Sequence, residues 1–445
     1  MDNFFYLLEK YLMGPMGKLA KLKYVRVLMN AGLATVPFTI VGSIFIILNN
    51  ISQTFPALKP FFEATFFKYS AIYSIGTTMS LGAIAIFYSL AIGYYLTDLY
   101  KIESKLNMNS FNGAILAIFA FLMTIVQTIF VDGSAQTITT IATKGSIVSG
   151  IAVSGGIVRF GGIGIFVAIV TGLLAVEIYR FCVVKNLTIK MPEGVPEGVS
   201  RAFASLVPAI LIAFTMIFIN IIFSTLGTDI HQVLGKPFGF VQNFVDSWLG
   251  AVIIMLLIHL LWSVGIHGTS IIKNSFVNPI LLVALTENMD GGNNILAGDF
   301  INMYIFLGGA GTTLSLVLLM QFYAKSDQLK MLAKASIIPG LFNINEPVVF
   351  GAPIVYNPYL VIPYIIVPIV NISIAYWAVK LQLVSKVIAA IPWTSPIGIG
   401  AFLGTGGDFR AVLLSFTCLI ISGFIYFPFF RIYDNNLYEE QTKGK

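Results

Sequence analysis

Nine apolar segments of this 445-residue chain are each about as long as a lipid bilayer is thick. An α-helix needs about 20 mainly apolar residues to cross the hydrocarbon core of a membrane. Hydrophobic residues make up 57% of the chain and charged residues 10%, whereas a soluble domain carries about 25% charge. The sequence therefore predicts an all-α polytopic membrane protein with about ten transmembrane helices. The apolar segments lie near residues 27–49, 73–97, 112–131, 162–184, 203–226, 249–266, 300–323, 358–379 and 410–431.

Several short connections between these segments carry clusters of Lys and Arg, namely the loops near 98–107, 185–201 and 325–334. Because short cytoplasmic loops are enriched in basic residues, we expect these loops and both chain termini to lie on the cytoplasmic side of the membrane. The net charge of +6 is then explained by orientation and by contact with anionic membrane lipid. It does not indicate nucleic-acid binding.

Three stretches of the C-terminal half do not resemble simple spans. Residues 268–287 are too short and polar for one complete crossing, and residues 335–356 and 390–407 are interrupted by Pro and Gly. We expect re-entrant hairpins or broken helices there. Such elements expose backbone donors and acceptors to a substrate near the middle of the bilayer.

The position of these interruptions suggests two functional halves. We expect residues 1–185 to form an N-terminal transmembrane scaffold or dimerisation half, and residues 186–202 a cytoplasmic linker. Residues 203–445 would then form the C-terminal half that binds and transports the substrate.

Glu346 is the only Asp, Glu, Lys, Arg or His between Lys334 and Lys380. A carboxylate in hydrocarbon is costly unless it is paired, hydrated or protonated. Irregular backbone at membrane depth persists only where protein or a water-filled cavity surrounds it. A lone carboxylate on a broken intramembrane segment therefore predicts a transport site.

His267 closes an apolar run that begins at Trp262, and Gly265 and Gly268 flank it. A neutral imidazole donates from one nitrogen and accepts at the other, which suits a sugar hydroxyl, and Gly268 would let a ligand approach the backbone. The alternative is a packed histidine bonded to a carbonyl. We expect His259 to be structural and His231 to be an ordinary surface residue.

Trp262 and Trp393 stand beside the broken segments rather than at clear span ends. Sugars present apolar C–H faces that stack on indole rings, although either tryptophan could instead belong to an interfacial belt. Asn343 could donate to hydroxyls or satisfy broken backbone, and the sequence leaves both readings open. We expect Lys273 to mark the end of a span.

Four segments together resemble a known family. The linker Met191-Pro192-Glu193-Gly194-Val195-Pro196-Glu197-Gly198-Val199 resembles the PEGVP signature of enzyme IIC, the membrane permease of the bacterial phosphoenolpyruvate-dependent sugar phosphotransferase system. The closest group is the lactose/cellobiose/diacetylchitobiose family. The segments from Trp262 to Gly268, from Asn343 to Pro347, and Pro392-Trp393-Thr394 are similar to the substrate site of that group.

The resemblance implies a homodimer in the bacterial inner membrane that holds a β-linked disaccharide near the bilayer middle. It implies that Glu346 and His267 contact the sugar near its 6-hydroxyl and serve as catalytic residues. It assigns Trp262 and Trp393 to packing of the sugar rings, and Gly268, Asn343 and Thr394 to the substrate-binding motifs.

In this family the phosphate arrives on a cysteine of enzyme IIB. The chain ends at Lys445 soon after the last apolar segment, and Cys182 and Cys418 lie in or beside apolar segments. We therefore expect a separate IIB subunit, and we expect cellobiose or diacetylchitobiose as the sugar rather than lactose.

Two other functions stay open from the residues alone. Glu346 and His267 could form the relay of a proton-coupled secondary sugar transporter, or His267 could be the base of a membrane-embedded transferase. No Walker A pattern occurs, and the spacing of Cys and His predicts neither a metal site nor a cofactor.

Overall fold

The computed structural model describes residues 11, 14–54, 59–125, 128–131, 134–137, 159–189, 191–192, 195–355 and 357–443. The chain forms two compact units. Unit 1 comprises Ile40–Thr77, Gln242–Lys445 and Met1–Lys21, and unit 2 comprises Leu22–Thr39 and Thr78–Val241, each within the described ranges. The contacts thus group residues 203–241 with the earlier spans. The assignment of dimerisation and transport to separate halves of the chain stays a prediction.

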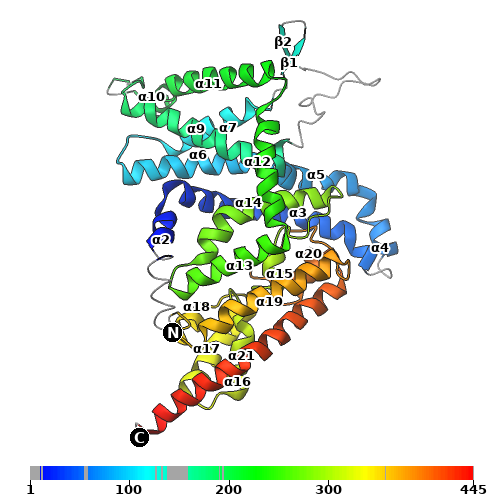
Figure 1. The fold of residues 1–445 in the computed structure, drawn as a ribbon. Coiled ribbons are helices and arrows are strands. Elements are labelled where there is room, and N and C mark those ends of the chain that lie inside the picture. Colours follow the sequence, from blue (N-terminus) through cyan, green and yellow to red (C-terminus); the bar gives the residue numbers. More distant parts are fainter. Residues whose placement is uncertain are drawn as a thin grey trace. The chain divides into compact units, whose positions relative to one another are not determined.

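Unit 2 is built around three helices, α6 (Ile84–Glu103), α7 (Ser110–Leu122) and α9 (Ile165–Val184), which pack on one another (Figure 1). Small residues let them approach closely. A Cβ atom on Gly93 of α6 would meet the carbonyl oxygen of Gly113 in α7. The surrounding elements are α10 (Glu197–Ala204), α11 (Leu206–Thr225) and α12 (Ile230–Val245), which runs on into unit 1, together with a hairpin of β1 (Thr128–Val131) and β2 (Ser134–Thr137).

Unit 1 has a core of three long helices, α13 (Trp248–Ser263), α19 (Val361–Lys380) and α21 (Phe409–Lys443). They lie side by side, with α19 in contact with both others (Figure 1). The remaining elements of this region are the π-helix η6 (Thr269–Val277), α14 (Asn278–Met289), α15 (Phe300–Tyr304), α16 (Thr313–Tyr323), α17 (Asp327–Leu341), α18 (Glu346–Gly351) and α20 (Ile399–Gly404). Earlier in the chain are α2 (Gly14–Lys21), α3 (Lys23–Thr54), α4 (Lys59–Ala64) and α5 (Ser70–Ser80).

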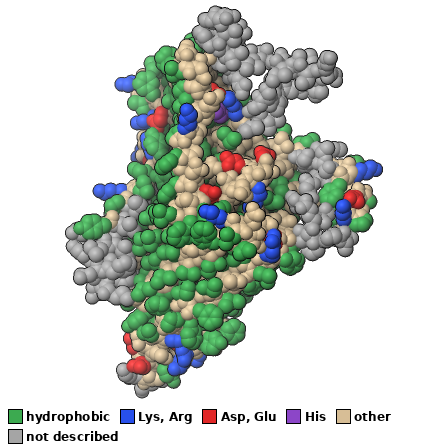
Figure 2. All heavy atoms as spheres, turned by 45° about the vertical axis from the view of Figure 1, so that its right-hand side comes forward, with side chains coloured by type: hydrophobic (Ala, Val, Ile, Leu, Met, Phe, Trp, Pro, Cys, Tyr) green, Lys and Arg blue, Asp and Glu red, His purple; other side chains and the backbone are tan. Residues whose placement is uncertain are grey.

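Seven helices of the described ranges are long and apolar enough to cross a membrane, or eight if the bent pair α12 and α13 counts as one span. Large apolar side chains on α21, among them Leu413, Ile420 and Phe424, are exposed and form a stripe at helical spacing. Figure 2 shows a broad hydrophobic surface of this kind. The all-α membrane fold is confirmed, whereas the count of about ten spans is not.

The prediction of one span over residues 300–323 is wrong. The chain leaves the helix after Tyr304 and re-enters it at Thr313. Gly308, Gly309 and Gly311 between them adopt positive φ angles of 81°, 97° and 84°. Glycine tolerates this conformation, which interrupts a helix. We call residues 307–312 the glycine loop.

The expectation that residues 268–287 are too short for one complete crossing is also wrong. Helices η6 and α14 join into a continuous helical segment of 21 residues, Thr269–Met289, which is long enough to span a membrane. Its polar side chains satisfy one another, since Asn278 Oδ1 accepts from Lys273 Nζ at 3.0 Å and Asn278 Nδ2 donates to Asn274 at 3.2 Å. The interruptions at 335–356 and 390–407 are confirmed, because α17 ends at Leu341 and only the short α20 lies in the second stretch.

Candidate functional site

His267 lies in the turn between α13 and η6, and its side chain is exposed. The backbone N–H of Ser270 donates to its Nδ1 at 3.1 Å, and Ser270 Oγ lies 2.9 Å from the same nitrogen. A nitrogen that accepts a hydrogen bond carries no proton, so the neutral ring holds its proton on Nε2. No residue in the described ranges bonds Nε2, and the His267 N–H donor is therefore available to a ligand.

Trp262 and Gly268 hold this turn against α13. The Trp262 side chain is 4% exposed, and its Nε1–H donates to Thr269 Oγ1 at 3.1 Å. Its ring lies against that of His267, with centroids 4.2 Å apart. A Cβ atom on Gly268 would collide with the carbonyl oxygen of Ile258 in α13. These contacts give both residues a packing role, and their contact with a substrate stays a prediction.

Glu346 is the first residue of α18, and its side chain is exposed. Its carboxylate makes no hydrogen bond or ion pair with any residue that the structure describes. It interacts electrostatically with His267 and with Tyr364 in the first turn of α19, so it lies near the imidazole. An unpaired charge beside apolar helices is costly unless water or a ligand meets it. Glu346 is thus available for a polar ligand.

The glycine loop supports the segment that carries Glu346. Asn345 is buried and donates from Nδ2 to the carbonyl of Ala310 at 2.8 Å. The N–H of Gly311 donates to Nε2 of His259 at 3.0 Å. His259 Nδ1 also lies 2.7 Å from the carbonyl of Met255, so the fully buried His259 has the structural role that was expected. Side chains thereby satisfy the backbone that the break in the helix leaves unpaired.

Asn343 connects the Glu346 segment to the Trp393 segment. Its Oδ1 accepts from the N–H of Gly308 at 2.8 Å, and its Nδ2 donates to the carbonyls of Trp393 at 2.7 Å and Ser395 at 3.2 Å. The amide is therefore used in holding broken backbone together, which is one of the two readings left open by the sequence. Contact between Asn343 and a substrate stays a prediction.

The Trp393 side chain is 49% exposed, and Thr394 is partly buried. An exposed indole on a loop with fixed backbone offers a flat apolar face for a sugar ring. Thr394 makes no hydrogen bond to another predicted site residue within the described ranges.

All seven predicted site residues belong to unit 1. Ring contact joins Trp262 to His267, electrostatic interaction joins His267 to Glu346, and hydrogen bonds join Asn343 to the Trp393 loop. The sequence placed these residues on three separate segments, and the structure links the segments through named contacts.

Two residues differ from what the sequence suggested, and a third lies outside every predicted motif. His231 is not a surface residue: it is 6% exposed, and its Nε2 lies 3.1 Å from Thr124 Oγ1. Lys273 lies in η6, five residues into the candidate span Thr269–Met289, and it is unexpectedly buried at 5% exposed. Asp299 belongs to no recognisable sequence motif, and its carboxylate accepts the N–H of Ile391 at 3.2 Å. Lys273 and Asp299 became recognisable only when burial was known.

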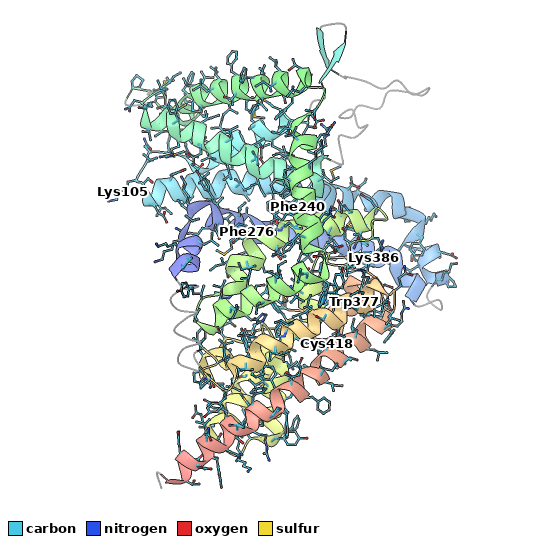
Figure 3. All side chains as sticks on the ribbon, in the orientation of Figure 1. Lys105, Phe240, Phe276, Trp377, Lys386 and Cys418 are labelled. Atoms are coloured by element: carbon cyan, nitrogen blue, oxygen red, sulfur yellow. The ribbon has the colours of Figure 1, made fainter. Side chains whose placement is uncertain are left out.

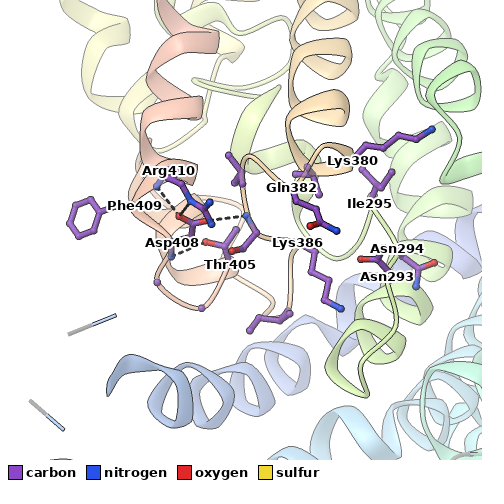
Figure 4. Close-up of a pocket in the computed structure, with 16 residues that line it drawn as sticks. Asn293, Asn294, Ile295, Lys380, Gln382, Lys386, Thr405, Asp408, Phe409 and Arg410 are labelled. Atoms are coloured by element: carbon purple, nitrogen blue, oxygen red, sulfur yellow. Dashed lines mark hydrogen bonds and ion pairs between the residues drawn. The ribbon is translucent and has the colours of Figure 1, made fainter. Parts of the chain in front are cut away.

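A cavity of about 1060 Å³ lies in unit 1 at the C-terminal end of α19. Figure 4 shows Asp408 and Arg410 on one side of it, Asn293 on the other and Lys386 between them. Burial would raise the pKa of Asp408, but hydrogen bonds from Arg410 and Ser385 outweigh it and lower the pKa to about 2. Tyr364, near Glu346, lies about 24 Å along the helix from the last residue of α19. The cavity is thus a feature distinct from the predicted site.

Neither cysteine is accessible to another protein. Cys182 and Cys418 are both fully buried, and Figure 3 labels Cys418 among the packed side chains of α21. A phosphoacceptor cysteine must be reached by its partner, so neither thiol suits that role.

The fold and the site together define a multi-spanning membrane transporter with a polar site. A carboxylate and an imidazole N–H that no described residue bonds, together with an exposed indole, suit a ligand that presents both hydroxyls and apolar C–H faces.

Comparison with known proteins agrees with this class. The family model described as "Phosphotransferase system, EIIC" matches residues 29–368. A cellobiose-specific EIIC component from Geobacillus stearothermophilus is 34% identical over 99% of this chain and 96% of its own length. The crystal structure of the transporter ChbC, the IIC component from the N,N'-diacetylchitobiose-specific phosphotransferase system, superposes with a TM-score of 0.86 at 34% identity over 98% of this chain and 99% of that one.

A lactose-specific EIICB component from Staphylococcus aureus (strain N315) is 26% identical over 96% of this chain and 72% of its own length. The chain belongs to the EIIC family of the sugar phosphotransferase system. It is a multi-pass membrane permease component of that system.

Proposed function

We propose that this permease carries a β-linked disaccharide, cellobiose or diacetylchitobiose, into the cell while a separate IIB subunit phosphorylates the 6-hydroxyl. The names of the cellobiose and diacetylchitobiose relatives support this sugar class. The observation that carries the proposal is the exposed carboxylate of Glu346, which has no bonding partner among the described residues. It interacts electrostatically with His267, whose Nε2 no described residue bonds.

The chemistry assigns a role to each group. The 6-hydroxyl oxygen attacks the phosphorus of the IIB phosphocysteine, an O–P bond forms, and the S–P bond breaks to release the thiolate. Glu346 orients the hydroxyl and accepts its proton, and His267 donates from Nε2 to a sugar oxygen. Trp393 stacks on a sugar ring, with Thr394 beside it. Trp262 and Gly268 contribute to sugar binding by shaping the turn that carries His267. Asn343 contributes by holding the backbone of the Trp393 loop.

The partner and the assembly belong to the same proposal. The lactose relative carries the EIICB designation, which supports the use of a IIB unit, and the buried Cys182 and Cys418 support its supply by another chain. We propose a homodimer in the bacterial cytoplasmic membrane with both termini in the cytoplasm. Basic loops such as 325–334 support that orientation. Light scattering of the purified protein and labelling of terminal cysteines in spheroplasts test these two points.

The sugar assignment is tested by calorimetric titration of the purified protein with cellobiose, diacetylchitobiose, lactose and maltose. We expect binding of the first two, weaker binding of lactose, and none of the α-linked maltose. Glu346→Gln should lose at least about tenfold in affinity, because a charged acceptor becomes a neutral amide. The matched control is Glu440→Gln, at an exposed position of α21, which should bind as the wild type does. Equal affinity of Glu346→Gln and wild type would remove Glu346 from the site.

A further inference from the structure

Two charged side chains of unit 1 lie inside the protein and outside all predicted motifs. Lys273 in η6 is 5% exposed. Asp299 directly precedes α15, and its side chain is partly buried. A charge removed from water is destabilising unless an opposite charge and hydrogen bonds compensate it. In a membrane protein such residues therefore require a reason.

Each charge is held by specific partners. Lys273 Nζ donates to Oδ1 of Asn278 at 3.0 Å. Asp299 Oδ1 accepts from Nδ2 of Asn302 at 2.9 Å, and Oδ2 accepts the N–H of Ile391 at 3.2 Å. The ammonium and the carboxylate also attract each other through space, although the structure describes no direct ion pair between them. Each charge thus has hydrogen-bond partners of its own and is attracted by the other charge.

The pair connects two segments of the candidate site. Lys273 follows His267 by six residues, and Ile391 precedes Trp393 by two. The next N–H toward the N-terminus, that of Ala390, donates to Ser43 Oγ at 2.7 Å, so side chains fix two successive backbone groups of this loop. A shift of Asp299 would strain or break its hydrogen bond to the backbone that leads to Trp393.

We propose that Lys273 and Asp299 form a buried charge pair that positions the Trp393 loop relative to the His267 turn and thereby sets sugar affinity. The inference rests on the proposed function. We assign both as positioning residues, since they act through Ile391 and η6. The bond from Ile391 to the carboxylate is charge-assisted and stronger than a bond to a neutral acceptor. Lys273 attracts this carboxylate through space and so favours its charged form.

The test compares single and double neutral substitutions in the full-length protein. Lys273→Met removes the ammonium at similar length, and Asp299→Asn retains an acceptor for Ile391. Each single variant leaves one buried charge uncompensated, and we expect cellobiose affinity, measured by calorimetry, to fall by about tenfold. The double variant has neither charge, so no buried charge is left without an opposite one. We expect it to bind within about threefold of the wild type, since coupled neighbours are not additive.

A second measurement separates positioning from general stability. Trp393→Ala should cost less affinity in the Lys273→Met background than in the wild type, because the loop is already displaced there. A control pair in unit 2 is Arg159 and Asp229, whose Nη2–Oδ2 distance is 2.7 Å. Arg159→Gln should lower the unfolding temperature without changing cellobiose affinity.

The outcomes distinguish the two proposals. Failure of the wild-type protein to bind cellobiose or diacetylchitobiose would overturn the proposed function. Normal binding by wild type and by both single variants would overturn only the positioning role. If the single variants do not fold, the double variant decides: a folded double variant that binds supports the charge pair, and one that folds without binding contradicts it.

Discussion

Asn343 offers the sharpest test of how the broken segments are held together. Its side chain makes three hydrogen bonds, to the N–H of Gly308 and to the carbonyls of Trp393 and Ser395. Its φ angle of 63° is left-handed, a conformation that Asn and Gly tolerate better than other residues. If each hydrogen bond contributes about 1 kcal/mol, Asn343→Gly should lower the free energy of unfolding by about 3 kcal/mol. Asn343→Ala should lose about 1 kcal/mol more through backbone strain.

Part of this loss should appear in sugar binding, because the bonds fix the loop that carries Trp393. If all of the 3 kcal/mol were linked to binding, affinity would fall by about 100-fold, which is the upper bound. Asn343→Asp retains the acceptor for Gly308 but turns an oxygen toward two carbonyls, so it should be worse than Asn343→Gly. Calorimetry with cellobiose and thermal unfolding in detergent provide the two readouts. Wild-type affinity and unfolding temperature in Asn343→Ala would refute the assignment.

Three further predictions concern other positions. Trp393→Ala should weaken cellobiose, diacetylchitobiose and lactose by a similar factor of about ten in calorimetry, because stacking tolerates ring substituents, and selective loss of one sugar would contradict stacking. Gly268→Ala should lower the unfolding temperature, since its Cβ would collide with the Ile258 carbonyl, and an unchanged value would contradict the close approach. Because the pKa of Asp408 is lowered to about 2, the ionised carboxylate stabilises the fold above pH of about 4 and loses this effect as pH falls toward 2. Asp408→Asn should therefore unfold at a lower temperature than the wild type at pH 6, and the difference between the two unfolding temperatures should narrow as the pH falls. A difference that does not change with pH would contradict a role for the ionised carboxylate.

The sequence predicted the break around Glu346 because Pro and Gly interrupt the apolar segment there. The isolated carboxylate within this segment predicted a polar site. The same reasoning failed at residues 300–323. The glycine loop has no charged residue, and Thr312 is its one polar side chain, so hydropathy conceals the break. Gly308, Gly309 and Gly311 were nevertheless a visible signal of backbone freedom.

Burial of individual polar residues was harder to predict. Lys273 and Asp299 are 26 positions apart, and neither carries a local pattern that announces the other. The burial of His231 depends on packing of α12 near Thr124, which is 107 residues away in the chain. Periodicity and composition report on local structure, whereas these contacts depend on how distant segments meet.

The central claim is that the carboxylate of Glu346, at a broken helix and without a bonding partner among the described residues, receives a sugar for phosphorylation. Vesicles that contain the purified permease, with phosphorylated IIB enclosed and labelled cellobiose outside, test it directly. The account predicts that label accumulates inside as the 6-phosphate, that accumulation requires phosphorylated IIB, and that Glu346→Gln abolishes it. Accumulation of unmodified cellobiose driven by a pH gradient, or wild-type rates in Glu346→Gln, would contradict the account.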